Sequence, residues 1–421
     1  MAISRRHFVA GSAFGASALA FGLGGSRAFA QDTVELDFPY LWTGPEAEAL
    51  QAIVDDFNAS QDAIQVRGVS NPDMQRMLAQ MSARNGFDIS DAFDSNIGPW
   101  AAAGAIMPLD DLISSAGYDT ADFIPSIMDR MKFDDKIYAM PIAVHTNMLM
   151  FNEALLDEAG LEPPKTTEDL QAAIEALTKV DDNGRITQLG MNQPDFVSFA
   201  YYFGGQWIDE NLQPTANHEG NVAALTFWVE NVLKKYGVDE IKRFQSGFGE
   251  YASPQNPFYT GKVAMVADGE WQARFIQQYA PDLAWGATYM PIPADKPELE
   301  RTAALSASMF FIPSNCSDPE AAWTFMEHLI SPEPMRDFTL ALANLPARSS
   351  LLEDEAYAEI PGMNYWLESL TSENLKFMPA TSWGQEYSTE ITSTMEQIIN
   401  LNKEPQEALD ELQEKALGIA G

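Results

Sequence analysis

A short stretch at residues 261–271, GKVAMVADGEW, places a large aromatic side chain where a ligand could reach it. The apolar run Val263–Val266 has the length of a buried strand, and the Gly-Lys pair before it is typical of a turn. Gly269 then indicates a bend, which leaves Trp271 just beyond the end of the strand. Open α/β sheets bind their ligands at such strand ends, so we predict that Trp271 lines a binding site. The alternative, from these residues alone, is that Trp271 fills the core.

Other residue types that commonly do chemistry are scarce. Cys316 is the only cysteine, which excludes an intrachain disulfide and a metal cluster built on cysteines. The four histidines, at positions 7, 145, 218 and 328, show neither HxH nor HxxxH spacing. Because nothing in the sequence indicates a zinc site or a Ser-His-Asp triad, we expect no metal ligands, no cofactor and no catalytic residues.

Strand and helix patterns that would position a site begin near the N-terminus. The segments VELDFPY at 34–40 and AIQVRGV at 63–69 are rich in β-branched and aromatic residues and predict strands. Between them, Leu50, Val54 and Phe57 recur at helical spacing and predict one apolar helix face. A strand, a helix and a strand within about 35 residues form a βαβ unit, which implies a parallel sheet.

Alternation of strands and helices continues along the chain. Thr166 and Asp169 have the spacing of a capping box and predict a helix start, and Ser317 and Glu320 repeat that spacing. The run SASMFFIP at 306–313 predicts the strand before the second of these helices. A chain of 421 residues exceeds what one hydrophobic core usually supports, so we predict two α/β lobes joined by short, strand-like crossings.

The first 30 residues have the pattern of an export signal. Arg5 and Arg6 precede Phe8 and a short Ala/Gly-rich apolar stretch, an order typical of the twin-arginine route. The segment ends in Ala28–Ala30, and we predict cleavage after Ala30 and a periplasmic mature protein. The alternative is a membrane anchor, which this short, glycine-interrupted stretch fits poorly.

The balance of charge excludes several classes of partner. The chain has 25 basic and 61 acidic residues and a formal net charge of −36 at pH 7. A surface this negative repels phosphate backbones and anionic lipids, so we expect neither nucleic-acid binding nor stable membrane insertion. The acidity is also compatible with an adaptation for solubility, and it does not fix the charge inside a pocket.

Seven segments, in order along the chain, resemble the sugar-binding proteins of ABC importers, the maltodextrin-binding-protein-like members of the extracellular solute-binding proteins. The longest is KFDDKIYAMPIAVHTNMLMFNEALLDEAGLEPPKTTEDL at 132–170, and FYTGKVAMVADGEW at 258–271 is similar to a second block of that family. The remaining five are the opening strand and helix with Trp42 and Gly44, GAIMPLDDLI at 104–113, FGGQWID at 203–209, the helix at 317–330 and LPARSS at 345–350.

This resemblance implies a type II periplasmic binding protein fold. Two α/β lobes, with parallel-rich sheets flanked by helices, would close by hinge motion over a ligand held in the cleft between them. The expected lobes are residues 31–143 with 300–346, and residues 147–297 with 349–421, with crossings near 141–146, 297–302 and 345–349. The implied protein is a monomer without enzymatic activity that delivers a sugar or sugar-like small molecule to an ABC permease pair with a cytoplasmic ATPase.

The resemblance also implies which residues bind the ligand. A sugar ring has an apolar face and an edge of hydroxyls, which suits a flat aromatic side chain surrounded by carboxylates, amides and hydroxyls. Trp271 matches a position that stacks on sugar in the family, whereas Ala92 and Asn96 replace a Trp and an Arg of the maltodextrin-binding relatives, so maltodextrin itself is not expected. The residues nominated in this way are Trp271, Asp94, Ser95, Asn96, His145, Trp42, Thr43, Trp383, Tyr387 and Arg348.

Three alternative functions remain open at this point. A secreted glycosidase would need two carboxyl groups placed across a glycosidic bond, and no acidic pair stands out in the sequence. A ferric-ion binder would use adjacent tyrosines such as Tyr201 and Tyr202, although one ring packing inward and its neighbour facing outward is the simpler interpretation. A binder of a phosphorylated polyol would need converging basic residues, for which Arg348, Arg84 and Arg274 are candidates.

Overall fold

The computed structural model describes residues 33–70, 73–81 and 86–421. The predicted export signal at residues 1–30 and the candidate Arg84 lie outside the described residues. Within the described part, no helix has both the length and the apolar character that crossing a membrane requires.

The N-terminal βαβ unit forms as predicted. Strand β1 (Val34–Tyr40) and strand β2 (Ile64–Ser70) pair in parallel, with helix α1 (Gly44–Ser60) as the connection between them. Leu50 and Val54 of α1 are fully buried, as the helical spacing of the apolar residues requires. The C-terminus of β1 and the start of α1 therefore place Trp42 and Thr43 at the carboxyl end of a strand.

One large sheet runs through the middle of the molecule, in the order β13-β11-β6-β9-β8-β7, with β10 and β12 also paired to β6 and β3 paired to β11. Its strands are β3 (Ser90–Phe93), β6 (Met140–Asn152), β7 (Lys179–Val180), β8 (Ile186–Met191), β9 (Val263–Gly269), β10 (Trp285–Thr288), β11 (Ala303–Phe311), β12 (Leu345–Pro346) and β13 (Leu375–Lys376). A separate hairpin joins β4 (Lys132–Phe133) to β5 (Lys136–Ile137).

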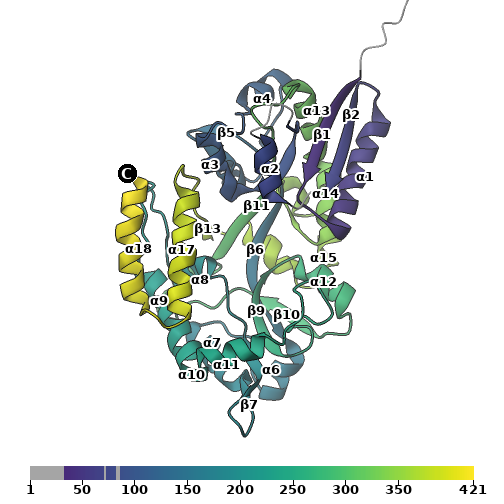
Figure 1. Cartoon of the computed structure of the whole chain (residues 1–421). Helices are drawn as coiled ribbons and strands as arrows, with labels where there is room; N and C mark the ends of the chain where they lie inside the picture. The colour runs from purple at the N-terminus through teal and green to yellow at the C-terminus, as the bar shows by residue number, and fades with distance from the viewer. Residues whose placement is uncertain (1–32, 71–72, 82–85) are drawn as a thin grey trace, which may run out of the picture.

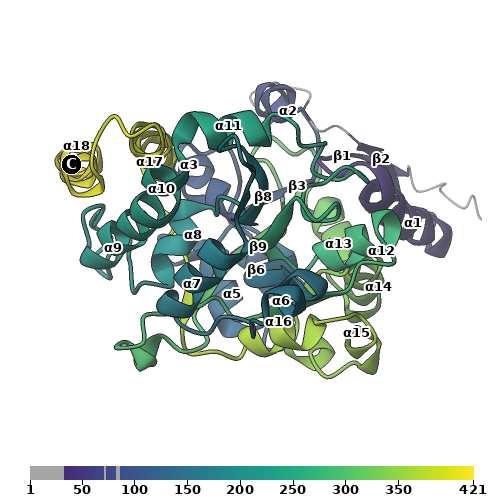
Figure 2. The ribbon, with the colours of Figure 1, turned by 90° about the horizontal axis from the view of Figure 1, so that it is seen from below.

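Strand β6 has thirteen residues and changes partners halfway along its length. Residues 140–146 of β6 pair with β11, and residues 147–152 pair with β9 and β10. In Figure 1, β6 accordingly runs from an upper group of helices, with α1, α13 and α14, to a lower group with α6 and α7. Viewed from below, β6, β9 and β8 lie in the middle of the lower group, with α6, α7, α8 and α11 around them (Figure 2).

The expectation of parallel-rich sheets needs correction. Among the described strand pairs, only β1–β2, β8–β9 and β11–β13 are parallel, and β6 pairs antiparallel with each of its four partners. Parallel pairing requires a crossover connection on one face of the sheet. The four strands beside β6 run in the opposite direction to it, so they are not linked to β6 as βαβ units. Such units therefore make up only part of this sheet.

Helices cover the strands on their outer faces, and α17 and α18 form a hairpin at the left edge of Figure 1. The helices that follow α1, as far as the start of β9, are α2 (Met74–Met81), α3 (Ile97–Ala102), α4 (Asp110–Ala116), α5 (Pro125–Arg130), α6 (Glu153–Ala159), α7 (Thr167–Leu177), α8 (Phe196–Tyr201), α9 (Glu219–Trp228), α10 (Lys234–Tyr236) and α11 (Val238–Gln245). The later helices are α12 (Gln272–Tyr279), α13 (Pro319–Leu329), α14 (Pro332–Leu342), α15 (Glu355–Ala358), α16 (Met363–Ser369), α17 (Gly384–Ile399) and α18 (Pro405–Ala420).

Of the two predicted capping boxes, one is present and one is not. Thr166 caps α7, and the reciprocal bond from its backbone to the Asp169 side chain completes the box. At α13 the cap is Asp318, whose carboxylate accepts from the Ala321 amide at 3.0 Å, so the prediction of Ser317 was wrong by one residue. The Ser317 hydroxyl instead donates to the Asp88 carboxylate at 2.9 Å, a long-range contact that local spacing does not encode.

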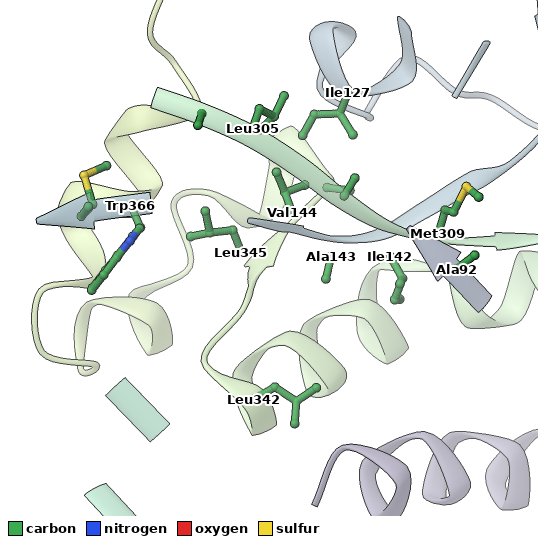
Figure 3. Close-up of a cluster of buried hydrophobic side chains, with 14 of the residues drawn as sticks. Ala92, Ile127, Ile142, Ala143, Val144, Leu305, Met309, Leu342, Leu345 and Trp366 are labelled. Carbon is green, nitrogen blue, oxygen red and sulfur yellow. The ribbon is translucent and has the colours of Figure 1, made fainter. Parts of the chain in front are cut away.

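The core is continuous across the change of partners in β6. Figure 3 shows Val144 of β6, Leu305 of β11 and Leu345 of β12 gathered there, with Trp366 of α16 nearby. Leu345 lies directly opposite Val144 in the β12–β6 ladder, and neither side chain has any exposed surface. Packing of this kind makes the centre of the sheet sensitive to the loss of a few methyl groups.

We expect Leu345→Ala to lower the free energy of unfolding by about 2–5 kcal/mol, because a buried leucine leaves a cavity that its neighbours fill only partly. Leu417→Ala is the matched control, since Leu417 is 49% exposed on α18, and it should change stability by less than about 0.5 kcal/mol. Denaturant unfolding of both variants measures the difference. Equal losses of stability in the two variants would contradict the packing of Leu345 against Val144 of β6.

Candidate functional site

Trp271 lies where the sequence predicted, just beyond the end of β9. It is the N-cap residue of α12, and its ring is half-buried. A side chain on Gly269 would meet the ring of Trp271, since a Cβ there would be only 2.1–2.5 Å from three ring atoms. Glycine at this position therefore allows the indole to lie against the backbone at the end of the strand.

The indole borders a hollow of about 430 Å³ whose lining is polar and aromatic. None of the described residues that line it is a lysine, an arginine or a histidine. The side chains that give it its chemistry are Asn147, Asn192, Gln193, Asp195, Tyr251, Asn256, Asp268, Trp271 and Gln272. Amides and carboxylates around aromatic rings can hold a ligand that has both hydroxyl groups and an apolar face.

Hydrogen bonds among the side chains of this hollow fix their positions. The Trp271 Nε1–H donates to the Tyr251 hydroxyl at 2.7 Å, and that hydroxyl donates to Asp268 Oδ1 at 2.8 Å. Burial of Asp268 raises the pKa of its carboxyl to about 6, although hydrogen bonds from Gly269 and Tyr251 oppose the shift. The aromatic rings and the carboxylate thus form one connected unit.

His145, on β6, lies beside Trp271 with its ring edge-on to the indole at a centroid distance of 5.5 Å. Its Nδ1 pairs with Glu270 Oε1 at 2.7 Å, and its Nε2 lies 2.9 Å from the Ser308 hydroxyl of β11. A carboxylate only accepts, so Nδ1 donates to Glu270, and Nε2 forms the second hydrogen bond with the Ser308 hydroxyl. Both nitrogens of His145 are therefore engaged by protein, and this ring supports the indole from the side.

Two carboxyl groups, Glu46 of α1 and Asp91 of β3, interact electrostatically, and Glu46 also interacts with this histidine. Burial raises the pKa of Asp91 to about 7, against the opposing hydrogen bond that the Leu41 amide donates to Asp91 Oδ1 at 2.7 Å. Burial likewise raises the pKa of Glu46, in the first turn of α1, and the charge of His145 lowers it. The buried Asp91 and the half-buried Glu46 thus form a pair of acidic groups with little access to solvent.

A second hollow, of about 540 Å³, brings Asp94 and Trp383 together. Asp94 is buried and forms an ion pair with Arg130, whose guanidinium carbon also lies 4.4 Å from the centre of the Phe377 ring. Burial lowers the pKa of Arg130 to about 9. Asp94 was nominated for its position in a loop, and the structure gives it a buried cationic partner that the sequence did not indicate.

The loop that follows Asp94 places its other two candidates differently. Ser95 is exposed, and Asn96 donates to the Phe93 carbonyl oxygen at 3.0 Å.

The two candidates that follow β1 differ in exposure. Thr43 is exposed directly before α1, and the half-buried Trp42 packs on Phe338 at a ring distance of 4.9 Å.

Tyr387 and Arg348 are committed to contacts inside the protein. Tyr387 has no exposed surface and donates to the Trp207 carbonyl oxygen at 3.1 Å. The Arg348 guanidinium is buried, pairs with Asp122 at 2.9 Å and donates to the Ile330 carbonyl oxygen at 2.9 Å. In this conformation neither side chain has a polar group free for a ligand.

The prediction that one of the tyrosines at 201 and 202 faces outward was wrong. Both rings are buried, at 5% and 1% exposure, because α8 ends at Tyr201 inside the core and Tyr202 continues into it. The Tyr202 hydroxyl donates to the Asn147 carbonyl oxygen at 3.2 Å, and burial raises the pKa of both phenols. Phenolate ligands for iron are thereby disfavoured, and the described residues contain no group of three acidic, histidine or cysteine side chains arranged to hold a metal ion.

Several residues of the site were missed by reasoning from the sequence. Asp268 and Glu270 lie within the same eleven residues as Trp271, so their proximity could have been inferred. Tyr251, Asp91 and Arg130 carried no usable signal, because each reaches the site through contacts distant in the sequence.

Comparison with known proteins places the chain in context. The family model for bacterial extracellular solute-binding proteins matches residues 43–336. The maltotriose-binding protein of Pyrococcus abyssi is 22% identical over 312 residues, which is 73% of this chain and 65% of that protein. The mannitol-binding protein of Pseudomonas aeruginosa is 24% identical over 271 residues, and the match spans 62% of this chain and 56% of that protein.

Solved structures confirm the predicted fold class. The structure of CpMnBP1 with mannotriose bound superposes with a TM-score of 0.79 at 25% identity, covering 91% of this chain and 100% of that one. An ABC substrate-binding protein of Listeria monocytogenes in complex with cycloalternan has a TM-score of 0.76 at 21% identity, covering 91% and 98%. The two-lobe type II periplasmic binding fold, expected from the resemblance, is the fold of this chain.

The raised pKa of Asp91 leads to a pH-dependent stability that one substitution should remove. The folded protein holds this proton up to about pH 7, whereas the unfolded chain releases it near 3.8, so the contribution of Asp91 to stability falls as the pH rises between these values. Asp91→Asn keeps the acceptor for the Leu41 amide and cannot ionise. The free energy of unfolding of this variant, relative to that of the wild type, should therefore rise by about 3 kcal/mol between pH 5 and pH 8.

Denaturant unfolding at the two pH values measures this gain, and Asp62→Asn, at an exposed aspartate, is the control that should show none. A difference between Asp91→Asn and the wild type that stays constant with pH would contradict the assigned burial.

Proposed function

This chain belongs to the family of bacterial extracellular solute-binding proteins, and we propose that its solute is a sugar or sugar-like molecule bound beside Trp271. The observation that carries the proposal is the half-buried indole at the edge of a hollow lined with amides and carboxylates. Stacking of a ring on the indole and hydrogen bonds from its hydroxyls to the polar lining together match the two surfaces of a sugar.

The names of the relatives support the same chemical class. They are described as binding maltotriose and mannitol, and the superposed structure of CpMnBP1 contains mannotriose. These ligands share many hydroxyl groups and lack charge. A lining free of lysine, arginine and histidine suits an uncharged ligand of this kind.

We further propose that two lobes, residues 31–143 with 300–346 and residues 147–297 with 349–421, close over the ligand. The change of partners along β6, between Thr146 and Asn147, supports a hinge there. His145 and Asn147 flank that point, so a ligand beside Trp271 would lie next to the hinge. Hinge closure around a ligand is a known motion of periplasmic binding proteins.

The biological setting follows from the family. We propose export by the twin-arginine route with cleavage after Ala30, a monomer in the periplasm, and delivery of the solute to an ABC permease pair with a cytoplasmic ATPase. The family consists of binding proteins, and the proposed role involves no catalysis. A closed, loaded form would be the one that the permease recognises, since closure changes which surfaces of both lobes are presented together.

A phosphorylated polyol is the weaker candidate ligand. Two of the three basic residues that could hold its phosphate are engaged elsewhere in the described structure. Arg348 pairs with Asp122, and Arg274 donates to the carbonyl oxygens of Leu340 and Ala341 at 3.0 and 2.8 Å. A phosphate beside Trp271 would instead face Asp195 and Asp268 without a compensating cation.

Binding and stability of a Trp271→Ala variant test the proposal. We expect its affinity for the tightest binder among mannobiose, mannotriose, maltotriose and mannitol to fall by about 30- to 1000-fold, as for loss of a buried aromatic anchor. Its free energy of unfolding should change little, because the indole borders an open hollow and its loss leaves no closed cavity.

Trp366→Ala provides the contrasting control, since Trp366 has no exposed surface and its loss should cost about 3–5 kcal/mol of stability. Calorimetric titration and denaturant unfolding give both quantities for each variant. A large stability loss in Trp271→Ala with unchanged affinity would assign Trp271 to the core and remove the basis of the proposal.

A further inference from the structure

The hydroxyl of Tyr251 lies at the centre of a complete hydrogen-bond network. It accepts from Trp271 Nε1 at 2.7 Å and from Gln272 Nε2 at 2.6 Å. It also lies 2.8 and 2.9 Å from the two carboxylate oxygens of Asp268, to which it donates its proton. A phenol has one donor and two acceptor lone pairs, so every hydrogen-bonding position of this hydroxyl is used.

Gln272 connects this network to the core. Its side chain is 2% exposed, its Oε1 accepts from the Tyr259 hydroxyl at 2.5 Å, and its Nε2 also donates to Asp268 Oδ2 at 2.8 Å. The phenol of Tyr259 therefore fixes which end of the amide points to Tyr251. The network thus runs from the exposed Tyr251 hydroxyl to the buried Gln272 amide, and hydrogen bonds at each step favour one arrangement of these side chains.

The side chain of Tyr251 is exposed and yet anchored by several contacts. It is 50% exposed and lies in the segment between α11 and β9, which contains no helix or strand. Its carbonyl oxygen nevertheless accepts from Asn256 Nδ2 at 2.7 Å, and its ring meets Phe275 of α12 edge-on at 6.0 Å. Exposed aromatic surface that is anchored in this way suits contact with a ligand more than internal packing.

We propose that Tyr251 is the positioning residue for Trp271, and that its hydroxyl fixes the plane of the indole in the orientation that receives the ligand. This inference rests on the proposed function, in which Trp271 is the stacking surface. Without the acceptor on Tyr251, the indole N–H would have to find water or turn towards the hollow. The family resemblance nominated Trp271 among its ligand-binding residues, but it nominated no residue of the 246–257 segment.

A consequence for specificity follows from the same bond. The indole N–H is the only polar group of the Trp271 side chain, and it is hydrogen-bonded to Tyr251. The side chain therefore offers a ligand its ring face and no donor. A ligand must then present C–H groups to Trp271 and turn its hydroxyls to the amides and to Asp195. The site should select a sugar that has a continuous apolar face over one that merely carries many acceptors.

The orientation of the indole can be measured in the free protein by NMR of 15N-labelled tryptophan. The Trp271 indole signal is identified by its loss in Trp271→Phe. In Tyr251→Phe we expect this signal to move upfield and its proton to exchange faster with water, because its acceptor is gone. Tyr236→Phe, at a half-buried tyrosine of α10, is the matched control and should leave the signal in place. An unchanged indole signal in Tyr251→Phe would overturn the positioning role.

Binding then tests whether the orientation matters. Tyr251→Phe should weaken affinity for the tightest binder of the four-sugar panel by roughly tenfold, and it should cause no further loss when Trp271 is already alanine. Equal losses in both backgrounds, or none in either, would overturn a role exerted through Trp271. If Trp271→Ala itself leaves affinity unchanged, the proposed function fails, whereas the indole signal in Tyr251→Phe still decides the positioning role independently.

Discussion

Strand β6 is the constraint on which the rest of this structure depends. Thirteen consecutive residues remain extended and nearly all buried, while their hydrogen-bonding partners change from β11 to β9 and β10. The side chains near that change, His145 and Asn147, are therefore held between the two halves of the sheet. Since Glu270 and Ser308 come from the neighbouring strands or their ends, the register of β6 sets the geometry of the candidate site.

Buried and half-buried carboxyl groups are the second organising feature, and their partners differ in kind. Asp94 has a cationic partner in Arg130, Glu270 has an imidazole, and Asp91 and Asp268 have chiefly neutral hydrogen-bond donors. Removing a carboxylate from water is less favourable when its partners are neutral than when they are charged. For this reason the pKa of Asp91 rises to about 7 and that of Asp268 to about 6. The hollow beside Trp271 is lined by two of the acidic side chains, Asp195 and Asp268, and by no described lysine, arginine or histidine.

Aromatic residues around the site separate into two roles. Trp42, Tyr387 and the tyrosines at 201 and 202 direct their rings into packing contacts, whereas Trp271 and Tyr251 border the hollow. The difference arises from what holds each polar atom. The hydroxyl of Tyr387 and that of Tyr202 bond to backbone carbonyls of the core, whereas the polar atoms of Trp271 and Tyr251 bond to each other at the edge of the hollow.

The sequence by itself determined the elements and the class of fold. Periodicity and capping residues are local, so the βαβ unit, the capping box of α7 and the strand before Trp271 could be predicted from adjacent residues. Ordered motifs were enough to indicate the family, and Gly269 and Trp271 marked one edge of the candidate site. Tertiary structure alone decided the antiparallel pairing of β6, the burial of both adjacent tyrosines and the pairing of Asp94 with Arg130. It also decided that the hydroxyl of Tyr251, twenty residues before Trp271, accepts the hydrogen bond from the indole N–H. These contacts join residues far apart in the chain, and their formation depends on strand register and on the exclusion of water, neither of which is encoded in the spacing of neighbouring residues.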